Sequence, residues 1–124
     1  MLRLMMALTV AVSMLATATA ADLTQAEKER FRDTAIVVGS VKANLRNPES
    51  VKWESISAND DASVVCVQYR AQNGFGGMNR EIVVYAKGKV SQSAAVWNRH
   101  CTKPLNDMDL VGGYVDKTYA RMMK

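Results

Sequence analysis

The stretch "YRAQNGFGGMNREIVVY", Tyr69 to Tyr85, consists of two alternating apolar runs joined by a loop rich in glycine. Alternation of apolar and polar residues with a period of two is typical of β-strands that bury one face. In the loop, the Asn-Gly step and Gly76-Gly77 favour backbone angles that most other residues avoid. The stretch therefore predicts an antiparallel hairpin with strands over residues 64–72 and 80–86. Its loop is too long for a two-residue turn, so a bulge or a wider loop is expected.

The segment that precedes the hairpin has the pattern of a long helix. Residues 23–45 carry apolar side chains at helical spacing, and Thr24-Gln25-Ala26-Glu27 fits a capping box at the start. The helix is expected to end before Asn47-Pro48, because a residue before proline avoids the α region. Gly39 weakens the middle of a helix by up to about 1 kcal/mol relative to Ala, and we expect it to mark close packing on a sheet. The expected buried positions are Phe31, Ala35, Val38, Val41 and Leu45.

Shorter patterns flank these elements. Val51 and Trp53 alternate with polar residues and predict a strand. Lys87-Gly88 predicts a tight turn into residues 89–91. Residues 94–101 fit either a strand or a short helix, because the period alone does not decide between them.

The C-terminal segment gives a weaker signal. Residues 107–124 have some helical character, which Gly112-Gly113 is expected to interrupt, and the tail from about residue 105 is expected to be partly flexible. Together the elements predict the α+β class: an N-terminal helix packed on a three- to four-stranded antiparallel sheet, in a single small domain over residues 21–124.

Residues 1–20 have the pattern of a signal peptide. Arg3 gives a positive start, residues 4–15 are apolar, and Ala18-Thr19-Ala20 is a small-x-small cleavage site. The apolar run is short for a membrane span. We therefore expect export to the periplasm or beyond the cell, with no transmembrane span after the signal is removed.

The two cysteines of the chain are Cys66 and Cys101. An even number of cysteines in an exported chain favours a disulfide. His100 and Cys101 suggest a zinc or thiol site instead, but adjacent ligands without a second close pair do not fit zinc. We expect a Cys66–Cys101 disulfide, no metal and no cofactor.

Motifs for catalysis or nucleotide binding are weak. His100 is the single histidine, and no Gly-x-Ser-x-Gly elbow accompanies it. The acidic pairs Asp60-Asp61 and Asp107/Asp109 are typical of solvated turns rather than of a glycosidase. The glycines of the hairpin match neither a dinucleotide fingerprint nor a P-loop. The 16 basic and 12 acidic residues are mixed along the chain, so nucleic-acid binding is not indicated.

Arg70 and Arg80 lie at the two strand ends that meet the glycine loop. Like charges that face each other across a hairpin disfavour the pairing unless they are solvated or bound to an anion. Solvation of both arginines is the simpler interpretation, and a bound anion remains the alternative.

"LRNPESVKW", followed by "VCVQYRAQNGFGGMNREIVVY", resembles a pattern found in a family of small exported proteins of bacteria and phages without an established activity. In that family a Leu-Lys/Arg-Asp/Asn-Pro-Asp/Glu-Ser turn precedes a Cys-containing strand and an Asn-x-Phe-Gly-Gly hairpin. The resemblance covers Leu45 to Tyr85, and Trp53 stands where Phe is the more familiar residue. It implies an exported protein and suggests that the two motifs pack together. The matching residues are Asn47, Pro48, Ser50, Asn73, Phe75, Gly76 and Gly77.

These patterns predict a non-enzymatic, exported protein that binds an unknown protein or envelope component and has no catalytic residue. The alternatives are an inhibitor or immunity protein against a cell-wall hydrolase or toxin, and a small hydrolase that uses Asp60, Asp61 or His100. The sequence leaves the oligomeric state open. The candidate contact loop is Asn73, Gly74, Phe75, Gly76 and Gly77, flanked by Arg70 and Arg80. The structural turn is Asn47, Pro48 and Ser50.

Overall fold

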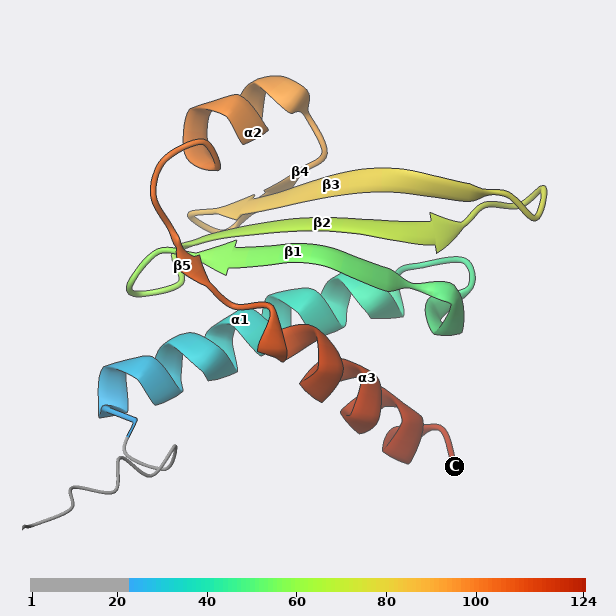
Figure 1. Cartoon of the computed structure of the whole chain (residues 1–124), viewed down its shortest axis with the longest axis horizontal. Helices are drawn as coiled ribbons and strands as arrows, with labels where there is room; N and C mark the ends of the chain where they lie inside the picture. The colour runs from blue at the N-terminus through green and yellow to red at the C-terminus, as the bar shows by residue number, and fades with distance from the viewer. Residues whose placement is uncertain (1–22) are drawn as a thin grey trace, which may run out of the picture.

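A five-stranded antiparallel sheet forms the centre of the fold, with the strands in the order β4-β3-β2-β1-β5 (Figure 1). The computed structural model describes residues 23–124, and the expected signal peptide, residues 1–20, lies outside them. The α+β class is confirmed, and the sheet has more strands than expected. The strands are β1 (Lys52–Ala58), β2 (Val64–Gln72), β3 (Met78–Ala86), β4 (Lys89–Ser91) and β5 (Asn106–Asp107).

Helices cover the two faces of the sheet unequally. Figure 1 shows α1 (Gln25–Ala43) and α3 (Leu110–Met122) on one face and the short α2 (Ala94–His100) on the other. A 3₁₀ turn, η1 (Pro48–Ser50), connects α1 to β1. Residues 94–100 are therefore helical, which decides between the two structures that their sequence pattern had left open.

The core lies between α1 and the centre of the sheet. Alternate residues of β2, including Val65 and Val67, are fully buried and face α1, whose Val38 is fully buried as well. The helix begins after Thr24, whose hydroxyl accepts a hydrogen bond from the Glu27 backbone N–H at 3.2 Å. The predicted cap and apolar face of this helix are thus confirmed.

Gly39 does not have the role expected of it. A Cβ added there would meet nothing within 4 Å, so no close packing on the sheet requires a glycine at this position. The expectation of close packing is therefore wrong.

The C-terminal segment forms an uninterrupted helix. Gly112 and Gly113 both lie inside α3, so the expected interruption is wrong. Phe31 of α1 packs edge to face against Tyr114 of α3, with ring centroids 5.4 Å apart. Val111 and Val115 are buried in the core, which explains why the helix forms despite its two glycines.

The opposite face of the sheet is joined to α2 by the disulfide. Cys66 of β2 is fully buried and is bonded to Cys101, directly after α2, so the predicted bridge is confirmed. Among the described residues, no helix combines the length and the hydropathy that a membrane crossing requires.

Candidate functional site

A single side chain orders the loop at the end of the β2–β3 hairpin. The Asn73 Oδ1 accepts hydrogen bonds from the backbone N–H groups of Phe75 at 2.9 Å and Gly77 at 3.1 Å. The Asn73 N–H donates to the Gly77 carbonyl at 2.8 Å, which closes the loop at its base. Gly76 has a φ of 83°, in the left-handed region where glycine carries little strain. The five residues therefore form an ordered loop wider than a two-residue turn, as expected.

Phe75 projects from this ordered loop. Its exposed fraction is 99%, so essentially none of the ring is covered by the protein. Single exposed apolar residues are common on protein surfaces. Phe75 differs because the hydrogen bonds of Asn73 already fix the backbone that carries it. Binding of the ring by a partner would therefore cost little backbone conformational entropy. The sequence had left open whether Phe75 is buried, and the structure places it outside.

The Pro48 turn packs against the base of the hairpin, as the two motifs suggested. The Gln72 backbone N–H donates to the Ser50 Oγ at 2.9 Å, and this hydroxyl donates to the Asn47 carbonyl at 2.7 Å. The Asn47 Nδ2 in turn donates to the Gln72 Oε1 at 2.6 Å. These side-chain bonds join the Pro48 turn to the end of β2.

Arg70 and Arg80 are held by a shared carboxylate. They face each other in the β2–β3 register, as predicted, and Glu54 of β1 binds both. The Glu54 Oε1 lies 2.6 Å from the Arg70 Nε, and its Oε2 lies 3.0 Å from the Arg80 Nε. Both arginine side chains remain about half exposed, at 51% and 55%, so they are solvated, and Glu54 of the same chain adds a counter-charge.

A β-bulge explains how Glu54 reaches the two arginines. The β1–β2 register shifts between Trp53 and Ser55, so one residue is inserted at Glu54. Trp53 pairs with Tyr69 on the core side, and Ser55 pairs with Gln68 on the opposite side. The insertion lets Glu54 share the outer face with the arginines.

Removing this carboxylate is expected to weaken the hairpin. In Glu54→Gln, two like charges face each other without a counter-charge, and we expect a loss of about 1 kcal/mol in the free energy of unfolding at low salt. The loss should shrink as salt rises, because these charges are partly exposed. Urea unfolding at two salt concentrations measures it. The same substitution made in an Arg80→Gln background should cost less, and an equal cost in both backgrounds would contradict this role.

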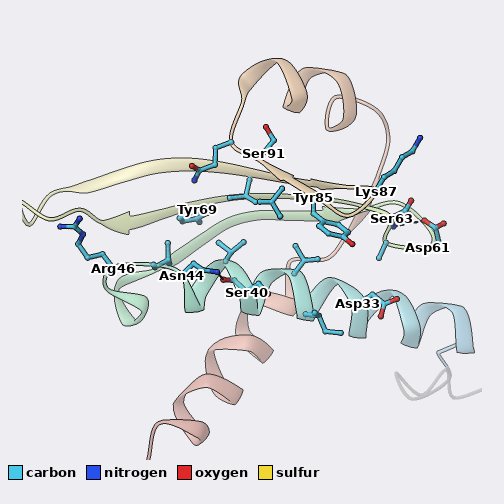
Figure 2. A pocket seen from close by; sticks show the side chains of 18 residues that line it. Asp33, Ser40, Asn44, Arg46, Asp61, Ser63, Tyr69, Tyr85, Lys87 and Ser91 are labelled. Carbon is cyan, nitrogen blue, oxygen red and sulfur yellow. Dashed lines mark hydrogen bonds between the residues drawn. The ribbon is translucent and has the colours of Figure 1, made fainter.

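A groove of about 950 Å³ runs between α1 and the β3–β4 half of the sheet (Figure 2). Its walls are largely apolar, while Arg46 lies at one end and Asp61 and Lys87 lie at the other. The exposed side chains of Ile36 and Val90 are part of its lining. No sequence pattern indicates this groove, because its lining comes from three separate segments, residues 33–46, 61–69 and 83–92. The apolar lining is Ile36, Val37, Val41, Leu45, Ala62, Val83 and Val90, with the rings of Tyr69 and Tyr85.

Tyr69 is the titratable group of the groove with a raised pKa. Burial raises the pKa of its phenol above 10.0, and the nearby carboxylate of Glu81 adds to the effect. A side-chain hydrogen bond with Gln92 acts in the opposite direction. Tyr69 therefore stays protonated at neutral pH, and Glu81 lies on the sheet face that the groove borders.

The acidic residues considered for hydrolysis bind groups of the chain itself. The Asp60 Oδ1 accepts a hydrogen bond from the Asn106 Nδ2 at 2.9 Å. The Asp109 Oδ1 accepts from the Ile56 N–H at 2.8 Å, and the Asp107 Oδ1 accepts from the Asp109 N–H at 2.8 Å.

Asp61 and His100 complete the set of candidates for catalysis. The Asp61 carboxylate accepts from the Ser63 N–H at 3.0 Å, and hydrogen bonds from Ser63 lower the pKa of Asp61. His100 is the last residue of α2, directly before the bridged Cys101. Within residues 23–124, no three His, Cys, Asp or Glu side chains are grouped closely enough to hold a metal ion.

The fold and these surfaces define a small disulfide-bonded α+β protein with an ordered, protruding hairpin loop and an apolar groove. In comparisons with known proteins, no family model, no curated protein and no solved structure matches the chain.

Proposed function

We propose that the chain is an exported, non-enzymatic binding protein whose contact surface is the loop Asn73–Gly77. The observation that carries this proposal is the exposure of Phe75 on a loop whose backbone is already hydrogen-bonded. Aromatic side chains are frequent anchors of protein interfaces, and an ordered loop reduces the entropy lost on binding.

Two features support export. Residues 1–20 carry the pattern of a signal peptide, and disulfides form and persist in oxidising compartments such as the periplasm. The proposed partner is therefore a protein or another component of the cell envelope.

Inhibition of a cell-wall hydrolase or toxin is a narrower form of the same proposal. A rigid loop with a projecting aromatic ring is suited to fill a cleft in another protein, and interfaces of inhibitors change little on binding. Survival of cells challenged with candidate toxins, with and without the gene, tests this form. The hydrolase alternative has less support, because Asp60 and Asp61 already accept hydrogen bonds from neighbouring groups.

The proposal predicts that Phe75→Ala keeps the fold and loses the partner. The ring is 99% exposed, so its removal should change the melting temperature little. Affinity capture from envelope extract with the oxidised protein should yield a partner that Phe75→Ala retains at least about tenfold less, as expected for a hot-spot aromatic residue.

Leu110→Ala is the matched control, because Leu110 is 86% exposed on α3 and lies outside the loop. It should capture the partner as well as the unaltered protein does. Equal capture by all three proteins, or no specific capture by any of them, would contradict the proposal.

A further inference from the structure

The outer edge of β3 is paired over only part of its length. The strand β4 pairs with Val84, Tyr85 and Ala86, and residues 78–83 have no strand on that side within the described part of the chain (Figure 1). Hydrogen-bonded and non-hydrogen-bonded pairs alternate along an antiparallel ladder. The Asn73–Gly77 backbone bond fixes that alternation, so the N–H and C=O groups of Met78, Arg80 and Ile82 point away from β2.

The side chains of this edge differ between the two faces of the sheet. Val83 lines the groove, and Glu81 lies on the same face, close enough to Tyr69 to raise its pKa. Arg80 and Ile82 lie on the other face, where Arg80 shares the Glu54 carboxylate with Arg70. Val83 is buried, with Gln92 of the same groove beside it, so a strand added here would meet the Glu81 carboxylate on the groove face.

A second copy of the chain fits this edge poorly. When two such edges pair antiparallel about a two-fold axis, outward-pointing residues must face outward-pointing residues. The registers centred on this edge therefore place either Arg80 opposite Arg80 or Glu81 opposite Glu81. Like charges that are directly opposed destabilise strand pairing, and charged residues on edge strands are a known protection against self-association. The charges of the edge therefore favour a different occupant.

We propose that residues 78–83 of β3 bind an extended peptide segment of a partner protein, which adds antiparallel to the sheet in line with β4. Backbone groups of Met78, Arg80 and Ile82 supply the hydrogen bonds, as in β-strand addition generally. Glu81 selects the segment, because a Lys or Arg of the added strand faces its carboxylate. This inference rests on the proposed binding function and names the chemistry of the partner.

The test is selection of random twelve-residue peptides displayed on phage, with the oxidised protein as bait. Recovered peptides should be enriched in Lys or Arg at one shared position. Ile82→Pro removes an outward N–H and leaves the bonds to β2 in place, so these peptides should bind it at least tenfold more weakly. Glu81→Lys should weaken the binding of these peptides at least fivefold. Glu29→Lys, a charge reversal on the exposed face of α1, should have no effect.

Three outcomes would overturn the inference. The first is no enrichment of peptides over an unrelated bait. The second is that the recovered peptides bind Ile82→Pro and Glu81→Lys as tightly as they bind the unaltered protein. The third is a dimer in solution that Ile82→Pro dissociates. Circular dichroism checks that Ile82→Pro is folded, and Glu81→Lys carries the test if it is not. Envelope capture that depends on Phe75 but not on Ile82 or Glu81 would refute the edge site and leave the proposed function intact, whereas absence of any capture would refute the proposed function.

Discussion

Replacing Cys66 and Cys101 together by alanine is expected to lower the free energy of unfolding by about 3–4 kcal/mol through loop closure alone. The two residues are 35 positions apart, so the bridge restricts a long loop of the unfolded chain. Cys66 is also fully buried, and truncation of a buried side chain leaves space that the core fills only partly. A domain of this size has on the order of 5–10 kcal/mol of stability in total, so the bridge is a large share of it.

The loss should be greatest around α2. This helix has seven residues and none of them is buried, so little other than the bridge and β3 holds it to the sheet. Urea unfolding measures the stability, and amide hydrogen exchange should show α2 exchanging much faster in the variant. Reduction of the unaltered protein with dithiothreitol is the control, because it breaks the bond without removing the sulfur atoms. Two free thiols per chain in the native exported protein would contradict the role of the bridge.

Gly112→Ala and Gly113→Ala are expected to change stability in opposite directions. A Cβ at Gly112 would lie 2.6 Å from the Trp53 Cδ1 and 2.9 Å from its Cγ, so the ring must move. A Cβ at Gly113 would meet nothing within 4 Å. Alanine is favoured over glycine by about 1 kcal/mol inside a helix, so Gly113→Ala should stabilise the protein by up to that amount.

Trp53 has little freedom to move away from position 112. Its Nε1 donates to the Asp116 Oδ1 at 3.1 Å, and its ring packs edge to face on Tyr69, with centroids 6.0 Å apart. The Lys42 Nζ binds the same Asp116 oxygen at 2.8 Å. Overpacking of such a site costs about 1–3 kcal/mol, so Gly112→Ala should be destabilising despite its better helix propensity.

Thermal and urea unfolding of the two single variants measure this difference. Since both glycines lie in α3, helix propensity contributes similarly to both, and the difference between them reports on Trp53. Gly112→Ala in a Trp53→Phe background should lose less stability than in the unaltered protein, because the smaller ring leaves more room. Equal stabilisation by both glycine substitutions would show that α3 does not pack against Trp53 in this way.

The β2–β3 hairpin and α1 could be predicted because each depends on residues that are close together in the sequence. The β2–β3 hairpin follows from period-two alternation around an Asn-Gly loop, and α1 follows from its cap and its apolar face. The strand β3 begins at Met78, two residues earlier than expected, because its pairing with β2 continues as far as Gln72 at the start of the loop.

The errors arose where a distant residue decides the local structure. In the sequence, Gly112 suggests an interrupted helix. In the fold, the ring of Trp53, 59 positions earlier, occupies the space that a side chain at position 112 would need. The two residues of β5 are too few to show any period, and they pair with β1 nearly fifty positions earlier. The arginine pair was recognised in the sequence, but its counter-charge Glu54 depends on a bulge that no sequence pattern marks.

The candidate site was predicted in part. The loop with Phe75 was identified from its glycines, whereas the outward direction of the ring depends on the bonds that Asn73 makes in the folded loop. The groove escaped prediction because α1 and β4 approach each other only in the folded chain.

Photocrosslinking at position 75 in producing cells tests most directly whether the Asn73–Gly77 loop is the contact surface. Phe75 is replaced by benzoylphenylalanine, which keeps an aromatic ring at the exposed tip, and Leu110 is replaced in the same way as a control. We expect illumination to yield a discrete adduct of higher mass from position 75 in the envelope fraction and none from position 110. Absence of an adduct at position 75, or the same adduct from both positions, would contradict the claim that this loop is the contact surface.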